Sequence, residues 1–143
     1  MRILLLRIVF AAYLVAVGFA VWAPNPADGA YAGVLAMPAR WLASLGLPFE
    51  PSYAVLEFTA NIAMFVPFGV LAMTAFRMRV WSTTLAGLAT SALIEGVQLF
   101  LPTRYSTVSD LVANTAGALV GALLVAAVRR SRTRRSQQLP SVA

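Results

Sequence analysis

The sequence predicts an all-α, polytopic membrane protein with four transmembrane helices and an interfacial or re-entrant segment between the first and the second. Hydrophobic residues make up 60% of the 143-residue chain and charged residues only 11%, whereas soluble domains carry about 25% charged residues. Several apolar runs also approach the ~20 residues that a helix needs to cross a bilayer. We therefore expect one membrane domain at residues 1–128, followed by a basic, disordered tail at residues 129–143.

The first apolar run, residues 3–22, predicts a transmembrane helix that the mature protein retains. A secretory signal peptide is the competing interpretation, because Arg2 and Arg7 give the run a basic start. The run is longer than the ~7–15 apolar residues of a signal peptide, and no clean cleavage site with small residues follows Trp22. We therefore favour the retained helix.

The segment at residues 23–52 is rich in proline and is not expected to span the membrane. Its middle part, residues 30–47, is apolar but is interrupted by Pro38 and Arg40, which leaves it too short and broken to cross. We expect it to lie at the interface with Trp41 at the level of the lipid head groups. A lid over the outer helix ends is the alternative.

Three further spans are expected at residues 57–76, 80–101 and 107–128. Pro67 removes a backbone hydrogen bond within the second span, so this helix should kink. Two stripes of small or polar residues at helical spacing should face other helices rather than lipid: Gly87, Ser91, Glu95 and Gln98, and then Ala113, Gly117 and Gly121.

Arginine placement predicts the orientation of the chain. With four spans, all but two of the 11 basic residues fall on the side that holds both termini and the loop between the second and third spans; the exceptions are Arg40 and Arg104. The positive-inside rule therefore places both termini in the cytoplasm. Because the arginines lie beside apolar spans, orientation explains the net charge of +6 better than nucleic-acid binding does.

Polar residues recur at helical spacing near the outer ends of the last three spans. Residues three or four apart share one helical face, and polar groups inside a membrane are costly enough to suggest a function. With a rise of ~1.5 Å per residue, one member of each pair lies roughly 8–10 Å below the outer boundary and the other about 2–5 Å below it. The deeper members are Asn61, Glu95 and Asn114, and the shallower ones are Glu57, Gln98 and Asp110, with Arg104 in the outer turn within reach. We expect these residues to form a polar pocket open to the outside.

Most of these residues also have a structural interpretation. Asp110 fits the capping box T-x-x-D with Thr107 at the start of the last span. Glu95 is the hardest to explain in this way, because it lies several residues inside a span. Asn61 and Asn114 can bond across helices. Gln98 can simply be solvated near the interface, and Arg104 can anchor the chain among the lipid head groups.

The composition restricts the chemistry of such a pocket. The chain has no Cys and no His, so thiolate chemistry is excluded and the commonest metal ligand and general base are missing. We expect no metal and no cofactor. Paired carboxylates could instead act as acid and base, hold a divalent cation through oxygen ligands, or bind a polar head group.

Four motifs in order resemble the VanZ-like family: N-I-A-M-F-V-P-F-G at residues 61–69, E-x-x-Q at 95–98, Arg104, and D-x-x-x-N-x-x-G-x-x-x-G at 110–121. The resemblance covers residues 55–128 and implies a small bacterial integral membrane protein. The family's named member is associated with low-level resistance to the glycopeptide teicoplanin. The positions carried over by motif are Asn61, Phe65, Pro67, Phe68, Gly69, Glu95, Gln98, Arg104, Asp110, Asn114, Gly117 and Gly121.

The leading hypothesis is a non-enzymatic protein of the bacterial cytoplasmic membrane. Its outer polar pocket would bind an envelope lipid, a lipid-linked wall precursor or a glycopeptide head group. The first alternative is a membrane enzyme that uses Glu95 and Asp110 on a lipid-linked substrate. The second is a small transport or scaffold subunit. Without His, Cys or a recognisable nucleophile motif, catalysis is the weaker hypothesis.

Overall fold

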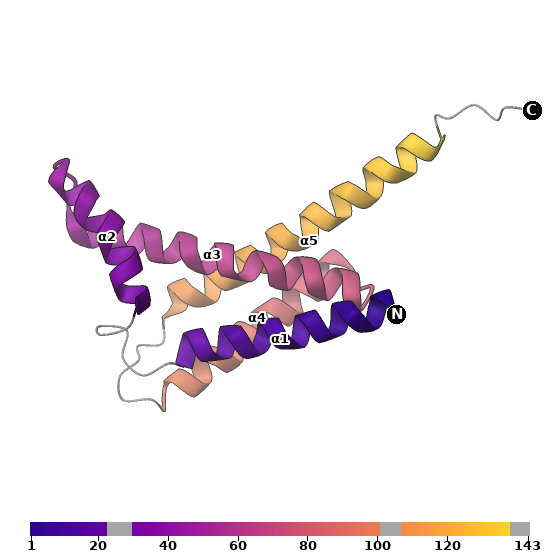
Figure 1. The fold of residues 1–143 in the computed structure, drawn as a ribbon, viewed down its shortest axis with the longest axis horizontal. Helices are drawn as coiled ribbons and strands as arrows, with labels where there is room; N and C mark the ends of the chain where they lie inside the picture. The colour runs from indigo at the N-terminus through magenta and orange to yellow at the C-terminus, as the bar shows by residue number, and fades with distance from the viewer. Residues whose placement is uncertain (23–29, 101–106, 138–143) are drawn as a thin grey trace, which may run out of the picture.

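The computed structural model describes residues 1–22, 30–100 and 107–137, and the regular structure in these residues is entirely helical. Figure 1 shows the helices gathered into an elongated bundle, with the N-terminus and the end of α5 toward the same end. Of the helices, α3 contacts each of the others, so the core is built around it. The helices are α1 (Arg2–Trp22), α2 (Ala30–Ser44), α3 (Phe49–Ala75), α4 (Val80–Gln98) and α5 (Val108–Gln137).

Three of the described helices, α1, α3 and α5, are long and apolar enough to cross a membrane. The predicted all-α membrane class is confirmed at this level, with three candidate spans rather than a clear four. The helix predicted as the third span, α4, has 19 residues but is not among them. Serines, threonines and Glu95 lower the hydropathy of α4.

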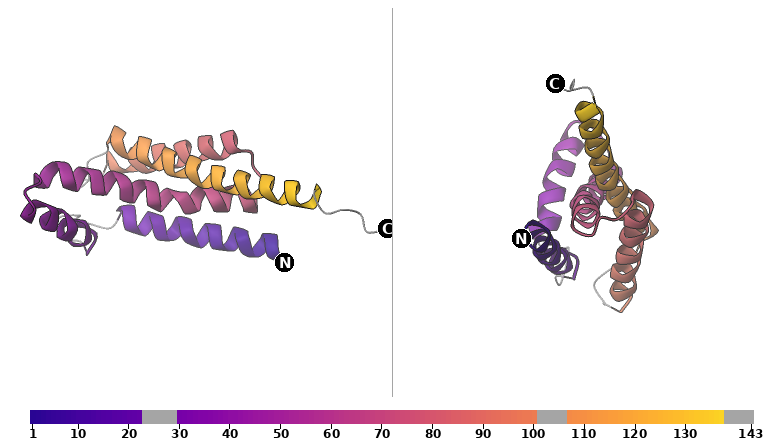
Figure 2. Two further views of the ribbon diagram at one scale, coloured as in Figure 1. Left: turned by 90° about the horizontal axis from the view of Figure 1, so that it is seen from above. Right: turned by 90° about the vertical axis from the view of Figure 1, so that its right-hand side faces the viewer.

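The helix directions follow from contacts between distant residues. Asn61 in the middle of α3 bonds Asp110 at the start of α5, and Met73 near the end of α3 bonds Arg129 in the later part of α5. These two helices therefore run parallel. In contrast, α1 is antiparallel to α3, because its early residue Arg7 reaches the end of that helix. Figure 2 shows α1, α3 and α5 extending along one common direction.

Residues 30–44 form the short helix α2, which is not among the candidate membrane spans, as the sequence predicts. Its 15 residues include Pro38 and would extend only about 22 Å at ~1.5 Å per residue. It packs on α3 and lies at an angle to it, at the left in Figure 1. Ala39 is buried in this contact while Trp41 is exposed.

Two helix boundaries differ from the sequence prediction. Helix α3 begins at Phe49 rather than near residue 57, because Pro48 serves as the N-cap and Pro51 falls in the first turn, where proline costs no helical hydrogen bond. At the other end of the chain, α5 continues past residue 128 to Gln137. Its basic extension contains no Pro or Gly, and arginine is a good helix former. Residues 138–143 lie outside the described part.

Glycines bring α3 and α5 into backbone contact. A Cβ atom added to Gly117 would collide with the Ile62 carbonyl oxygen, and one added to Gly121 would collide with that of Val66. From the opposite side, a Cβ on Gly69 would collide with the carbonyl oxygen of Ala118. The predicted small-residue ridge thus faces α3. Such close approach increases dispersion contacts, which drive helix association in membranes.

A second set of contacts attaches α1 to α3. The Tyr13 hydroxyl donates a 2.7 Å hydrogen bond to the Met64 carbonyl, one turn before Pro67. Proline cannot donate a backbone bond and crowds the preceding turn, so carbonyls in this turn are open to other donors. Phe10 packs edge-on against Phe68 of α3 in the same region. Helix α3 itself continues through Pro67.

Candidate functional site

The first contact of the polar cluster joins α3 to α5. Asn61 Nδ2 donates a hydrogen bond of 2.6 Å to Asp110 Oδ1, and both side chains are partly buried. Glu57 lies one turn earlier on α3, is exposed, and interacts electrostatically with the like charge of Asp110. One neutral amide therefore faces two carboxylates. The described residues of this corner therefore carry an excess of negative charge.

The second contact accommodates Glu95, the deepest acid. Its side chain is 8% exposed, and Oε2 accepts a 2.9 Å hydrogen bond from the Thr107 N–H. Thr107 immediately precedes α5, where backbone N–H groups lack helical partners and the helix dipole favours an anion. The carboxylate of α4 is thus held by the N-terminus of α5.

Thr107 also forms half of the predicted capping box. Its hydroxyl oxygen accepts a 3.1 Å bond from the Asp110 N–H. In the full capping box the Asp110 carboxylate would return a bond to the Thr107 N–H, but Glu95 accepts from that N–H instead. Asp110 is consequently available to Asn61, and the capping residue links α4 to α5.

The third contact lies deeper, between α4 and α5. Asn114, 3% exposed, donates from Nδ2 to the oxygen of the fully buried Ser91 at 3.0 Å. A bond of this kind between helices is the structural interpretation of Asn114 from the sequence. Within the described residues, Asn114 Oδ1 and the hydroxyl of Thr83 are buried without a hydrogen-bond partner.

The remaining predicted site residues are Gln98 and Arg104. Gln98 is 7% exposed and lies on the buried face of α4 with Ser91 and Glu95, as the polar stripe predicts. Arg104 lies outside the described residues. The structure thus joins Glu57, Asn61 and Asp110 in one corner, Glu95 with the start of α5 in a second contact, and Asn114 with Ser91 in a third.

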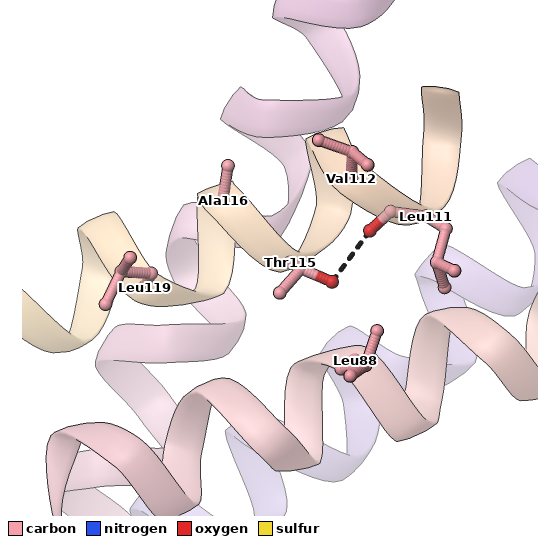
Figure 3. Close-up of a pocket in the computed structure, with 6 residues that line it drawn as sticks. All are labelled: Leu88, Leu111, Val112, Thr115, Ala116 and Leu119. Atoms are coloured by element: carbon pink, nitrogen blue, oxygen red, sulfur yellow. Dashed lines mark hydrogen bonds between the residues drawn. The ribbon is translucent and has the colours of Figure 1, made fainter. Parts of the chain in front are cut away.

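An apolar cavity lies beside this cluster, between α4 and α5 (Figure 3). Its volume is about 330 Å³, and it is lined by Leu88 from α4 and by residues of α5 such as Leu111 and Leu119. The only hydroxyl in its lining, that of Thr115, donates to the Leu111 carbonyl at 2.7 Å (Figure 3). The lining therefore suits hydrocarbon and is distinct from the predicted polar pocket.

The end of the molecule that carries the polar cluster offers mainly hydrogen-bond acceptors to a ligand. Three helices contribute one carboxylate each, from Glu57, Glu95 and Asp110. In the part of the chain that the structure describes, no cation is paired with them, and no group of three or more acidic side chains is placed to hold a metal ion. Such acceptors attract ammonium groups, hydroxyls and amides of a ligand.

The family model described as VanZ/LLP1 matches residues 8–129 of the chain. The chain belongs to the VanZ/LLP1 family. Comparisons with curated proteins and with solved structures found no match. The VanZ/LLP1 match begins well before residue 55, so it includes most of α1 and all of α2 in addition to the motif-bearing helices.

The residues of the VanZ-like motifs divide into two groups in the structure. Phe65 and Phe68 are buried in the core around α3, and three glycines form the contact between α3 and α5. The polar group makes the bonds between helices: Asn61, Glu95, Asp110 and Asn114.

Sequence reasoning missed two partners in this part of the molecule. The backbone N–H of Thr107 holds Glu95, and no side-chain pattern identifies a particular backbone donor. Tyr13 of α1 was also missed, although a tyrosine in the middle of an apolar span is itself a signal, because its hydroxyl needs a hydrogen-bond partner.

Proposed function

We propose that this VanZ/LLP1 protein is a receptor in the bacterial cytoplasmic membrane that binds an envelope-lipid or glycopeptide head group at its acid-bearing end. The supporting observation is the pair of carboxylates at Glu57 and Asp110, one exposed and one partly buried, to which the described residues supply one neutral amide and no cation. An amine-bearing head group would add positive charge and donate hydrogen bonds to both acids.

The proposal requires that this end faces outward, which follows if α4 is a fourth span. Because α3 and α5 run parallel, the chain must return from the end of the first to the start of the second. The connecting helix, α4, bonds α5 in antiparallel order through Ser91 and Glu95. Its 19 residues extend about 28 Å at ~1.5 Å per residue, close to the ~30 Å hydrocarbon core.

Four spans place the termini and the basic loop on one side and the acids on the other. The positive-inside rule then assigns the arginine-rich side to the cytoplasm. Lipid-linked wall precursors and glycopeptides meet at the opposite side. A contribution to teicoplanin-type resistance through this contact is part of the proposal and rests on the family's named member.

The test is ligand-induced thermal stabilisation of purified protein, with teicoplanin and a lipid-linked wall precursor as probes. A ligand at ~100 times its Kd stabilises the folded state by about 2.7 kcal/mol, which shifts Tm by several degrees. Glu57→Gln should abolish the shift and leave the baseline Tm unchanged or slightly raised, because the exposed Glu57 side chain makes no hydrogen bond to described residues and its charge is repelled by that of Asp110. Glu50→Gln, also exposed and on α3, is the matched control and should keep the shift.

Glu95→Gln separates binding from structure. Loss of the shift at an unchanged baseline Tm would extend the binding site to Glu95. A lower baseline Tm with the ligand shift retained would assign Glu95 to the joining of α4 and α5 alone. The proposal fails if neither probe shifts the Tm of the unmodified protein, or if Glu57→Gln responds as Glu50→Gln does.

A further inference from the structure

The opposite end of the molecule carries a groove that the proposed head-group site does not involve. It lies between α3 and α5 and has a volume of about 360 Å³. Its walls are apolar, with Val70 from α3 and Leu124, Val125 and Val128 from α5. Two arginines, Arg129 and Arg132, line the same groove. An apolar groove with a cationic end is complementary to an amphiphile that has an anionic head.

Helical spacing arranges these residues in depth. Leu124, Val128 and Arg132 are four residues apart and share one face of α5. From Leu124 to Arg132 the helix rises about 12 Å, which carries the groove from hydrocarbon depth to the head-group level. The opposite wall offers no free polar group, because the Thr74 hydroxyl donates to the Val70 carbonyl at 2.6 Å.

The cationic end is positioned by the fold. Arg129 Nη2 donates a 2.9 Å hydrogen bond to the Met73 carbonyl, which holds the guanidinium against the end of α3. A guanidinium has five N–H donors, so this bond leaves others for a ligand. Arg132 is exposed one turn further along α5. Two arginines so placed match the paired oxygens of a phosphate.

Among the described residues, no acidic side chain is placed to neutralise these arginines. The sequence contains only five acids. Asp28 lies outside the described residues, and the other four belong to the far ends of their helices: Glu50, Glu57, Glu95 and Asp110. The described part of the chain therefore supplies no counter-charge to Arg129 and Arg132, which leaves them open to an anionic ligand.

We propose that the groove is a binding site for an anionic glycerophospholipid, with an acyl chain against Leu124 and Val128 and the phosphate at Arg129 and Arg132. A second basic depression nearby is lined by Arg129, Arg130, Thr133 and Arg134. It has no apolar wall, so it lacks the feature that would select a lipid chain. The groove combines both requirements and is independent of the acid-bearing end.

Two pairs of matched variants test the site in full-length protein. Arg132→Gln removes a charge at the groove, whereas Arg130→Gln removes a charge from an exposed position on the same helix that does not line it. Leu124→Trp fills the groove, whereas Leu123→Trp places the same ring at the adjacent position, which does not line the groove. The two side chains are similarly exposed, at 52% for Leu124 and 50% for Leu123. Arg129 is left unchanged because it also bonds α3.

The measurement is native mass spectrometry of detergent-solubilised protein titrated with phosphatidylglycerol, and with phosphatidylcholine of the same chains. Unmodified protein should retain phosphatidylglycerol preferentially. Arg132→Gln should weaken it about tenfold, as expected for the loss of a charge-assisted hydrogen bond. Leu124→Trp should weaken it similarly, and Arg130→Gln and Leu123→Trp should stay within about twofold of the unmodified protein.

Either of two results overturns the proposal. Equal losses in Arg130→Gln and Arg132→Gln would mean that lipid responds only to the overall positive charge. Unchanged binding in Leu124→Trp would mean that no chain occupies the groove. Thermal melts of all four variants control for folding. If a charge variant is destabilised, the leucine pair, which changes no charge, still decides the question.

Discussion

At the scale of single residues, α4 carries two buried hydroxyls with opposite expected contributions to stability. Ser91→Ala should lower the free energy of unfolding by about 0.5–2 kcal/mol, because it leaves the buried Asn114 amide without its acceptor. Thr83→Val is the matched control. The Thr83 hydroxyl has no partner among the described residues, so replacing it with a methyl group of similar shape should be neutral or stabilising.

Denaturation in mixed detergent micelles measures both variants. A Ser91→Ala protein no less stable than the Thr83→Val protein would contradict the bond between α4 and α5, because loss of the bonded Ser91 hydroxyl should cost more than loss of the Thr83 hydroxyl, which has no partner among the described residues.

The residue pattern predicted which polar side chains face the helix bundle, but not their partners. Spacing alone placed Glu95 and Asn114 on buried faces, since that depends only on the 3.6-residue period. Pairing depends on how far one helix slides along another. Asn61 and Asp110 were expected at different depths, yet they are bonded at 2.6 Å. No pattern within one helix determines that offset.

At the scale of the elements, the glycines between α3 and α5 determine how closely these helices pack. Gly117→Ala should destabilise the protein by about 1–3 kcal/mol, because the new methyl would meet the Ile62 carbonyl of the α3 backbone, which cannot move aside as a side chain can. Gly96→Ala on α4 is the control. A Cβ there meets nothing within 4 Å, so improved helix propensity should stabilise by up to about 1 kcal/mol.

Thermal melts of both alanine variants provide the measurement. A Gly117→Ala protein as stable as the unmodified one would mean that α3 and α5 are not held in the close contact described.

The existence of the long helices was predictable, and their ends were less so. Apolar length identified α1, α3 and α5, because each must present hydrocarbon to lipid over a full span. The start of α3 was missed because prolines were taken as breaks, although Pro48 and Pro51 occupy positions that suit the first turn. Much of α4 is in contact with other helices. The residues that make these contacts are mostly small or polar, and they lower the hydropathy of α4.

At the scale of the whole molecule, the charges are separated along the bundle. Arg7 donates to the Ala75 carbonyl at 3.5 Å, and its guanidinium lies 5.3 Å from the centre of the Phe76 ring. Arg129 bonds the nearby Met73 carbonyl. Two arginines from other helices thus meet the negative end of the α3 dipole, while the acids of α3, α4 and α5 gather at the opposite end. This polarity predicts one preferred orientation in a membrane.

That orientation can be measured directly, because the chain contains no cysteine. Single cysteines at Ser109, in the first turn of α5, and at Ser131, near its other end, mark the two sides, and both positions are exposed. In right-side-out vesicles a membrane-impermeant maleimide should label Ser109→Cys and spare Ser131→Cys; in inverted vesicles the pattern should reverse. The reason is that α5 crosses with its basic end inward only if α4 has already returned the chain to the outside. A chain in which α4 did not cross would begin α5 in the cytoplasm, and the two labels would exchange sides.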